Sequence, residues 1–233
     1  MCGRYTLTVD LRDIAERFGV AADQEAPAGA DPALAAGPRY NIAPTQLVIT
    51  VAANGARHVE PMRWGLIPSW AKDPKIGSRL INARAETLAE KPAFRSALRR
   101  RRCLLPSDSF YEWATVPGSK AKRPMRVRLK SGEVYAFAGL WDEWTPPEGG
   151  PAVRSCTIVT TEPNELMATF HHRMPVILSP QAEAAWLDPR ISDPSQLVPL
   201  LRPYPADLME AYPVSPAVNS IANDSAQLIL PLE

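Results

Sequence analysis

Hydrophobic and polar positions alternate along this chain in two different periods, which predict short helices among a larger number of strands. Helical spacing over residues 11–18 predicts a first helix, capped by Asp10 and ended by Gly19. Prolines at the first helical position predict three more helices, from Pro92 to about Arg101, from Pro180 to Leu187 behind Ser179, and from Pro194 to Leu201 behind Asp193.

Strand-like segments account for most of the remaining chain. They are rich in β-branched residues or alternate in polarity, at residues 46–53, 125–130, 134–141, 155–161 and 174–178. In one of them the alternation predicts a core-facing side and a side that faces water or phosphate, formed respectively by Met125, Val127 and Leu129 and by Arg126, Arg128 and Lys130. Residues 21–38 are rich in Ala, Pro and Gly and predict a surface loop.

These elements favour a single domain that spans residues 1–233. The sequence contains no internal repeat, and a chain of this length can bury a sizeable core without cross-links. Many short strands and few helices indicate an α+β fold built on a curved antiparallel sheet with short flanking helices.

Charge adds a feature that the hydrophobic pattern does not show. The net charge is +1, but residues 91–130 contain twelve Lys or Arg residues against Asp108 and Glu112, a local balance of +10 that leaves −9 for the rest of the chain. Such a segment is typical of a surface that binds a polyanion, because cations near phosphates displace condensed counterions. An ordinary solvated basic helix and strand is the equally weighted alternative.

The cysteines and the N-terminal segment indicate a cellular compartment. Cys2, Cys103 and Cys156 are odd in number and lack CxxC spacing, which argues against a disulfide framework and a zinc knuckle and favours a reducing compartment. Charged residues within the first twenty positions argue against a secretory signal, and no run approaches the ~20 apolar residues of a membrane span. We expect a cytoplasmic protein with no membrane partner.

The N-terminus carries the most distinctive chemistry. Removal of Met1 would leave Cys2 with an α-amine and a thiol on adjacent carbons, and both titrate near neutral pH, at about 8 and about 8.5. An aldehyde can form an imine with the amine, and the thiol can then close a five-membered thiazolidine. A frayed terminus is the alternative, but the strand character of residues 4–9 argues against it.

Two further positions combine titratable groups with apolar neighbours. Glu112 lies between Tyr111 and Trp113, where burial would raise its pKa and suit it to move protons, although an ion pair with an arginine is equally compatible. His171 and His172 precede a strand-like segment, so one of them could act as a general acid or base, and a surface or supporting role is the alternative. No ligand spacing surrounds them, and we expect neither a metal nor a cofactor.

Seven ordered motifs span nearly the whole chain: MCGRYTL, PRYNIAP, RWGLIPSWAKD, INARAET, FYEW, HHRMPVIL and VSPAVNS. Together they closely resemble the SRAP family, the SOS-response-associated peptidase-like proteins that shield abasic sites in DNA. The resemblance implies a single α+β domain around a strongly bent, barrel-like antiparallel β-sheet with short flanking helices.

The resemblance also implies roles for particular residues. Cys2 would form the cross-link, Asn82 would position the N-terminus, Glu112 would shuttle protons, and His171 would act on the abasic sugar. Arg84 and Arg173 would contact phosphates. The implied DNA-binding set is completed by Arg4, Asn41, Pro44, Thr45, Trp64 and Trp70, and core packing is the alternative for at least one of the two tryptophans.

The function implied is a sensor and shield of abasic sites in single-stranded DNA that forms a covalent thiazolidine through Cys2, with weak abasic-site lyase activity as a by-product. The partner would be single-stranded DNA containing an abasic site, bound by a monomer that is associated with the nucleoid when on DNA. Two rivals stay open at this point. One is a thiol peptidase that uses Cys2 on a peptide or on its own N-terminus, and the other is a non-covalent reader of modified bases.

Overall fold

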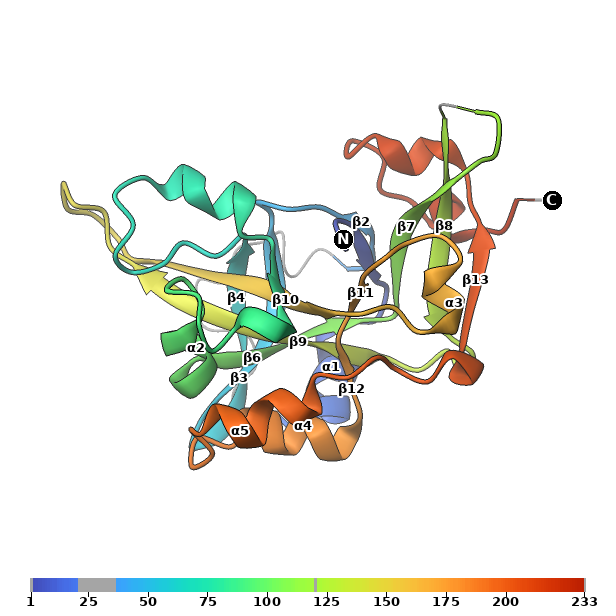
Figure 1. The fold of residues 1–233 in the computed structure, drawn as a ribbon. Helices are drawn as coiled ribbons and strands as arrows, with labels where there is room; N and C mark the ends of the chain where they lie inside the picture. The colour runs from blue at the N-terminus through green and yellow to red at the C-terminus, as the bar shows by residue number, and fades with distance from the viewer. Residues whose placement is uncertain (1, 21–36, 120, 233) are drawn as a thin grey trace.

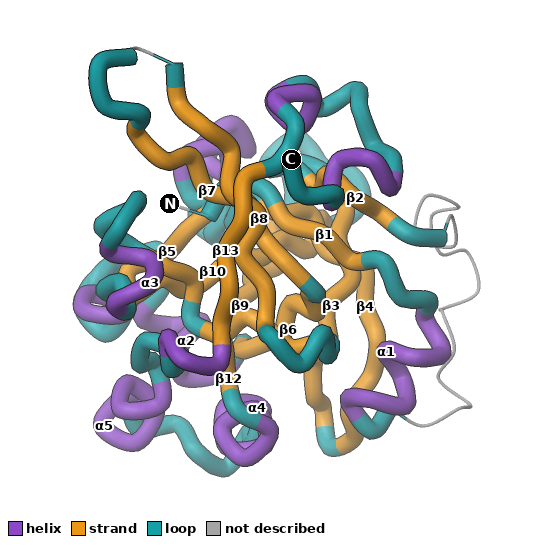
Figure 2. The backbone as a smooth tube through the Cα atoms, turned by 90° about the vertical axis from the view of Figure 1, so that its right-hand side faces the viewer, coloured by secondary structure: helices purple, strands orange, loops and turns teal. Residues whose placement is uncertain are grey.

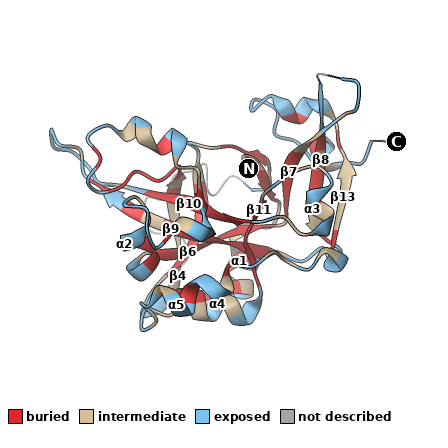
Figure 3. Cartoon of the chain, viewed as in Figure 1, coloured by how far each residue is buried: buried red, intermediate tan, exposed pale blue. Residues whose placement is uncertain are grey.

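A computed structural model describes residues 2–20, 37–119 and 121–232 of the chain (Figure 1). The predicted loop at 21–38 lies outside these residues, apart from Gly37 and Pro38. The strands form two sheets, and a few short helices flank them. Figure 3 shows that the buried residues follow the strands through the centre of the molecule, while the helices expose one side to solvent.

A closed five-stranded barrel forms the body of the fold. Its strands pair in the ring β4, β3, β6, β9 and β10, with β10 returning to β4. Their bounds are β3 (Leu47–Asn54), β4 (Ala56–Trp64), β6 (Arg102–Ser107), β9 (Tyr135–Trp144) and β10 (Val153–Thr161). The barrel and the α+β class are as predicted.

The expectation of a wholly antiparallel sheet is wrong at two pairings. β4 and β10 are parallel where the barrel closes, with Trp64 opposite Cys156. The short strand β5 (Asn82–Arg84) also runs parallel to β10, with Asn82 opposite Ile158. Two short strands, β11 (Met174–Pro175) and β12 (Ile177–Leu178), pair with β10 and β9 and replace the single strand expected at 174–178.

A second, antiparallel sheet stands beside the barrel and carries the N-terminal segment. Its order is β13, β8, β7, β1 and β2. The bounds are β1 (Tyr5–Leu7), β2 (Arg39–Ile42), β7 (Ser109–Thr115), β8 (Lys122–Leu129) and β13 (Met209–Pro213). Strand β1 is paired on both sides, with β2 and β7, so the N-terminal segment from Tyr5 onward is fixed in a sheet and does not fray.

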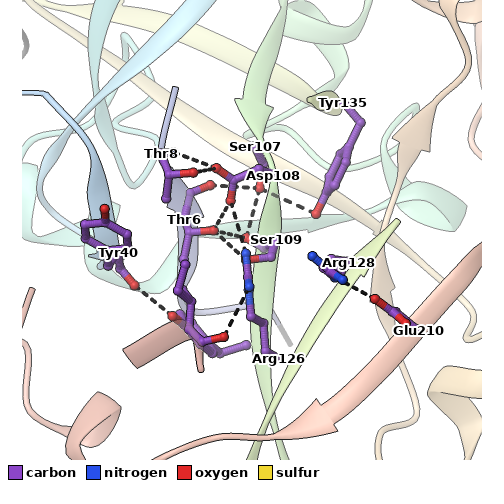
Figure 4. Close-up of polar contacts among 12 residues, drawn as sticks. Thr6, Thr8, Tyr40, Ser107, Asp108, Ser109, Arg126, Arg128, Tyr135 and Glu210 are labelled. Carbon is purple, nitrogen blue, oxygen red and sulfur yellow. Dashed lines mark hydrogen bonds and ion pairs between the residues drawn. The ribbon is translucent and has the colours of Figure 1, made fainter. Parts of the chain in front are cut away.

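Side-chain contacts lock β1 in place from both of its faces. On one face the ring of Tyr5 packs edge-on against Trp64 and Phe137, at centroid distances of 5.4 and 5.8 Å, which joins this sheet to the barrel core. On the other, Asp108 accepts hydrogen bonds from the hydroxyl of Thr6 and from the amide and hydroxyl of Thr8, as Figure 4 shows. The segment that leads to Cys2 therefore starts from a rigid support.

The helices agree with the prediction in part. Helix α1 (Leu11–Phe18) has Asp10 as its N-cap and Gly19 in the left-handed conformation that ends it, and α4 (Pro180–Leu187) is capped by Ser179. Helix α2 (Arg95–Arg100) begins three residues later than expected, because residues 92–94 form a turn in which the Phe94 amide donates to the Lys91 carbonyl oxygen. Helix α5 (Pro194–Leu197) ends early and continues as a 3-10 turn, Val198–Leu200.

The smaller helical elements were not predicted from the sequence. They are α3 (Glu165–Ala168) and the 3-10 turns η2 (Pro74–Arg79), η3 (Ala85–Thr87), η5 (Ala206–Leu208), η6 (Pro216–Asn219) and η7 (Ala226–Ile229). Gly77, within η2, and Gly65 bring their backbones close together. A Cβ on Gly77 would lie 2.7 Å from the carbonyl oxygen of Gly65, so only glycine fits there.

The basic segment 91–130 does not form one surface. Arg102 is buried and donates to the carbonyl oxygens of Leu98, Arg99, Trp186 and Asp188. The predicted outward orientation of Arg126 is wrong: the side chain is buried because β13 pairs with β8 at this position, and it donates to the hydroxyls of Ser109 and Tyr212. Arg128 pairs with Glu210, and only Lys130 of the three is exposed.

The C-terminal residues fold back over the second sheet (Figure 2). A separate small apolar cluster lies beneath them, formed by Tyr111, Val214, Val218 and Leu228. We call residues 214–224 the C-terminal strap. It covers the face of the second sheet that is turned away from the barrel core.

Candidate active site

Asn82 holds the backbone of Cys2. Its side-chain amide Nδ2 donates to the carbonyl oxygen of Cys2 at 2.9 Å. The parallel pairing of β5 with β10 fixes Asn82 at the edge of the barrel, opposite Ile158. The two residues are 80 positions apart in the sequence, so this contact exists only because the barrel edge and the N-terminal segment meet.

The thiol of Cys2 is fully buried. Its sulfur lies 3.9 Å from the carbonyl oxygen of Arg4, within the range of a weak S–H hydrogen bond. Burial, followed by the negative charge of Glu112, raises the pKa of this thiol well above its ordinary value. Cys2 is therefore a neutral thiol at pH 7 in this structure, and Glu112 is close enough to influence it.

Glu112 and His171 lie side by side next to Cys2. Glu112 lies on β7 and is 3% exposed, and burial raises its pKa. The Nε2 atom of His171 is 3.9 Å from the Glu112 carboxylate. The other ring nitrogen, Nδ1, lies 2.9 Å from the carbonyl oxygen and 3.0 Å from the amide of Arg173, which fixes the ring orientation. Burial lowers the pKa of His171.

An open groove of about 560 Å³ adjoins this pair, and His171 lines it. Its other walls come from β7, β8 and the turn around α3, and they mix aromatic, hydroxyl and cationic side chains: Trp113, Thr115, Lys122, Pro163, Ala168, Thr169, Phe170 and His172. We call this the site groove. Sequence reasoning missed Trp113 and Lys122 as lining residues, although Trp113 follows Glu112 directly in the FYEW motif.

The two arginines implied as phosphate contacts differ in availability. Arg84 is exposed at the end of β5. Arg173 is mostly buried and makes a two-armed ion pair with Glu86, at 2.6 and 3.0 Å, while also donating to the carbonyl oxygen of Thr160. A phosphate that reaches Arg173 must therefore compete with Glu86, a partner that the sequence did not reveal.

Residues of the implied DNA-facing loops separate into two groups. Trp70 is 59% exposed, and Thr45 is exposed with a positive φ of 74°, next to half-buried Pro44. Trp64 is fully buried, and its indole Nε1 donates to the carbonyl oxygen of Ile81 at 2.8 Å. Trp64 therefore takes the core-packing alternative and does not face DNA, because its ring is enclosed in the core and packs against Tyr5.

Arg4 and Asn41 are engaged within the protein. Asn41 is 2% exposed, and the guanidinium of Arg4 donates to its side-chain oxygen at 2.7 Å. Both side chains also bond to the C-terminal strap. The expectation that Asn41 contacts DNA is wrong, because its side chain is buried. The hydrogen bonds of Arg4 indicate a role inside the protein.

Among the residues that the structure describes, no group of three or more His, Cys, Asp or Glu side chains has an arrangement that would hold a metal ion. In the same part of the chain, no helix is both long enough and apolar enough to cross a membrane. All three cysteines are free thiols.

Fold and site together define a single-domain α+β protein in which an N-terminal thiol, a buried carboxyl group and an imidazole meet beside an open groove. The chain belongs to the SRAP family: the family model described as SOS response associated peptidase matches residues 1–221.

Proteins named for abasic site processing are similar to this chain. The abasic site processing protein YoqW of Bacillus subtilis is 52% identical over 98% of this chain and 99% of its own length. The abasic site processing protein HMCES of Gallus gallus is 34% identical over 78% of this chain, which corresponds to 60% of that longer protein.

Solved structures share the fold. A crystal structure of a protein from Bacteroides thetaiotaomicron superimposes with a TM-score of 0.87 at 24% identity and covers the whole of both chains. Another, from Bordetella bronchiseptica, gives a TM-score of 0.74 at 25% identity over 92% of this chain and all of that one.

Proposed function

We propose that this protein, once Met1 is removed, captures abasic sites in single-stranded DNA by forming a thiazolidine between the deoxyribose aldehyde and Cys2. The observation that carries the proposal is the convergence of Asn82, Glu112 and His171 on the N-terminal segment, with the Asn82 amide bonded to the Cys2 carbonyl at 2.9 Å. The relatives named abasic site processing proteins support the choice of substrate.

The reaction needs the free amine of Cys2, because in the unprocessed chain that nitrogen belongs to a peptide bond with Met1. The amine nitrogen attacks C1′ of the ring-opened sugar and gives a carbinolamine, which loses water to form an iminium ion. The sulfur then bonds to C1′ and closes the five-membered ring. The aldehyde and the aminothiol are thus converted to a thiazolidine and one molecule of water.

The titration behaviour of Glu112 and His171 suits these steps. Neutral His171 takes the proton of the C1′ hydroxyl and returns it to the ring oxygen as the sugar opens. Protonated Glu112 gives the proton with which the carbinolamine hydroxyl leaves as water, and its carboxylate accepts the thiol proton as sulfur attacks. Burial supports both states, because it raises the pKa of Glu112 and lowers that of His171.

The surroundings of the pair supply contacts for the DNA strand. The site groove offers Trp113 and His172 for stacking and Lys122 for a phosphate, and Arg84 stands exposed at the end of β5. Trp70, Pro44 and Thr45 would contact the flanking nucleotides. If the iminium ion persists before ring closure, β-elimination of the 3′ phosphate follows, so weak lyase activity is part of the proposal.

A thiol peptidase is less well supported. Such an enzyme needs a reactive thiolate, and burial raises the pKa of the Cys2 thiol. Forming a thiazolidine tolerates a neutral thiol, because the proton can pass to Glu112 at the moment of attack. A non-covalent reader would use the same groove but would have no need of the convergence around Cys2.

The proposed setting is the cytoplasm, where a monomer would associate with nucleoid DNA. The decisive experiment incubates protein whose N-terminus is confirmed as Cys2 with single-stranded DNA carrying one abasic site, followed by a denaturing gel. A shifted band only on the damaged strand is expected. Cys2→Ser should lose the heat-stable adduct. No band with wild-type protein would refute covalent capture, and salt-sensitive binding that denaturant reverses would favour the reader.

A further inference from the structure

Both terminal nitrogens of the Arg4 guanidinium group donate to the C-terminal strap, and one of them also donates to Asn41. Its Nη1 atom donates to the side-chain oxygen of Asn41 and to the carbonyl oxygen of Val218, both at 2.7 Å. Its Nη2 atom donates to the carbonyl oxygen of Asn219 at 3.2 Å. Two of these three acceptors lie more than 200 residues away in the sequence, so the bonds join the two ends of the chain.

Asn41 anchors the same strap to β2. Its Nδ2 atom donates to the carbonyl oxygens of Val218, Ser220 and Asn223, at 3.2, 2.9 and 2.8 Å. One buried amide therefore organises the backbone of the strap and also presents its oxygen to Arg4. A buried side chain with this many satisfied bonds is costly to replace, because each unpaired group loses its compensation for desolvation.

The backbone of Arg4 points toward the reacting residues. Its carbonyl oxygen accepts a hydrogen bond from the amide of Tyr111, the neighbour of Glu112 on β7, at 3.0 Å. The same oxygen accepts the weak hydrogen bond of the Cys2 thiol, at 3.9 Å. The side chain of Arg4 thus bonds to the strap, while its main chain lies beside both Cys2 and the strand that carries Glu112.

The strap also holds the other wall of the site. The indole Nε1 of Trp113, which lines the site groove and follows Glu112 on β7, donates to the side-chain oxygen of Asn219 at 2.8 Å. Asn219 therefore accepts from Trp113 with its side chain and from Arg4 with its main chain. Asn219 thus contacts both the strand that carries Glu112 and the segment that carries Cys2.

We propose that Arg4 and Asn41 are positioning residues that use the C-terminal strap to hold the Cys2 amine and thiol in line with Glu112. The inference rests on the proposed capture of abasic sites. An N-terminal residue is otherwise the most mobile part of a chain, and confining a nucleophile removes much of the entropy that a reaction must overcome. This explains the motifs PRYNIAP and VSPAVNS, which contribute no reacting group.

The kinetic test separates positioning from DNA contact. Arg4→Lys keeps the positive charge and loses the three-bond geometry. We expect its single-turnover cross-linking rate at saturating abasic DNA to fall about tenfold or more. The DNA concentration at half-saturation should stay within about twofold, and the slope of log affinity against log salt should not change. Arg57→Lys, which alters an arginine that donates to the Phe18 carbonyl at 2.8 Å, is the matched control.

A second readout uses formaldehyde, which has no phosphate. The wild-type protein and Arg4→Lys, each with Cys2 confirmed as the N-terminus by mass spectrometry, are compared for the rate of thiazolidine formation. A slower rate for Arg4→Lys supports positioning. Equal formaldehyde rates with an unchanged saturating rate on DNA would overturn it, as would a half-saturation weakened well beyond twofold, which would indicate a direct DNA contact.

Asn41→Ser extends the test to a residue that is buried inside the protein. It should show the same kinetic signature as Arg4→Lys. If both variants lose cooperative thermal unfolding, the strap serves the stability of the whole fold and the inference is wrong. Failure of the proposed function is distinct from all these outcomes, because wild-type protein would then form no adduct with abasic DNA.

Discussion

The Nε2 atom of His171 lies 3.9 Å from the carboxylate of Glu112, across the boundary between the second sheet and the turn that follows α3. Burial shifts the two pKa values in opposite directions, upward for Glu112 and downward for His171. Both shifts favour a protonated carboxyl group beside a neutral imidazole.

This pair predicts the pH dependence of cross-linking. The rate should fall at high pH, as Glu112 loses its proton, and at low pH, as His171 gains one. Glu112→Gln should lose the alkaline fall and cross-link about 10² to 10⁴ times more slowly, because the proton for the leaving water is missing. Single-turnover rates across the pH range measure this. An alkaline fall that persists in Glu112→Gln would assign that limb to another group.

Stability should depend on Glu112 in a related way. Its folded pKa lies above its unfolded value of about 4.3, so its stabilising contribution is complete below that pH and is lost as pH rises through the folded pKa. Glu112→Gln should therefore match the wild-type thermal midpoint near pH 4 and exceed it near pH 8. Calorimetric scans at both pH values measure the difference, and equal midpoints at pH 8 would contradict a costly buried charge.

Asn82 offers a nearly isosteric test of N-terminal positioning. Asn82→Asp replaces the amide that donates to the Cys2 carbonyl with an acceptor, so the contact becomes repulsive. We expect cross-linking about tenfold slower or worse, with a cooperative melt retained. Asn54→Asp, at the exposed end of β3, is the control for the added charge. An unchanged rate in Asn82→Asp would remove Asn82 from the site.

The two tryptophans of RWGLIPSWAKD should behave differently. Trp70→Ala removes an exposed ring and should weaken binding of single-stranded DNA by about 1–3 kcal/mol while the melting temperature stays near that of wild type. Trp64→Ala opens the core and breaks the bond to Ile81, so it should destabilise the fold by about 3–5 kcal/mol. Fluorescence titration and urea unfolding measure the two effects, and a destabilised Trp70→Ala would contradict the assignment.

The two tryptophans also show what the sequence can and cannot predict. Local spacing predicted α1 and α4 with their caps, because Asp10, Gly19 and Ser179 act within a few residues of their own helix. Trp64 is buried because its ring packs against Tyr5 of the second sheet and its indole donates to the Ile81 carbonyl oxygen. No local pattern encodes a contact between residues so distant in the sequence.

The same reason explains the error at Arg126. Alternation along residues 125–130 predicts a strand with one solvent-exposed face, and it correctly placed Val127 and Leu129 in the core. It could not foresee that β13 and the C-terminal residues would cover the other face, where Arg126 reaches Tyr212 and the carbonyl oxygen of Ile229. Long-range strand pairing, more than composition, decides which cations remain available to DNA.

Glu86 decides whether Arg173 is available to DNA, because it forms an ion pair with this arginine, which was expected to contact phosphate. The hydrogen bonds from Arg173 are the first cause of the lowered pKa of Glu86, which favours the ionised carboxylate. Glu86→Gln should release the charge of Arg173, strengthen binding of single-stranded DNA several-fold at low salt, and steepen the salt slope by about one. Arg173→Gln should reverse both effects. Anisotropy titrations at several salt concentrations measure them. Weaker binding by Glu86→Gln would mean that Glu86 orients Arg173 instead of competing with phosphate for it.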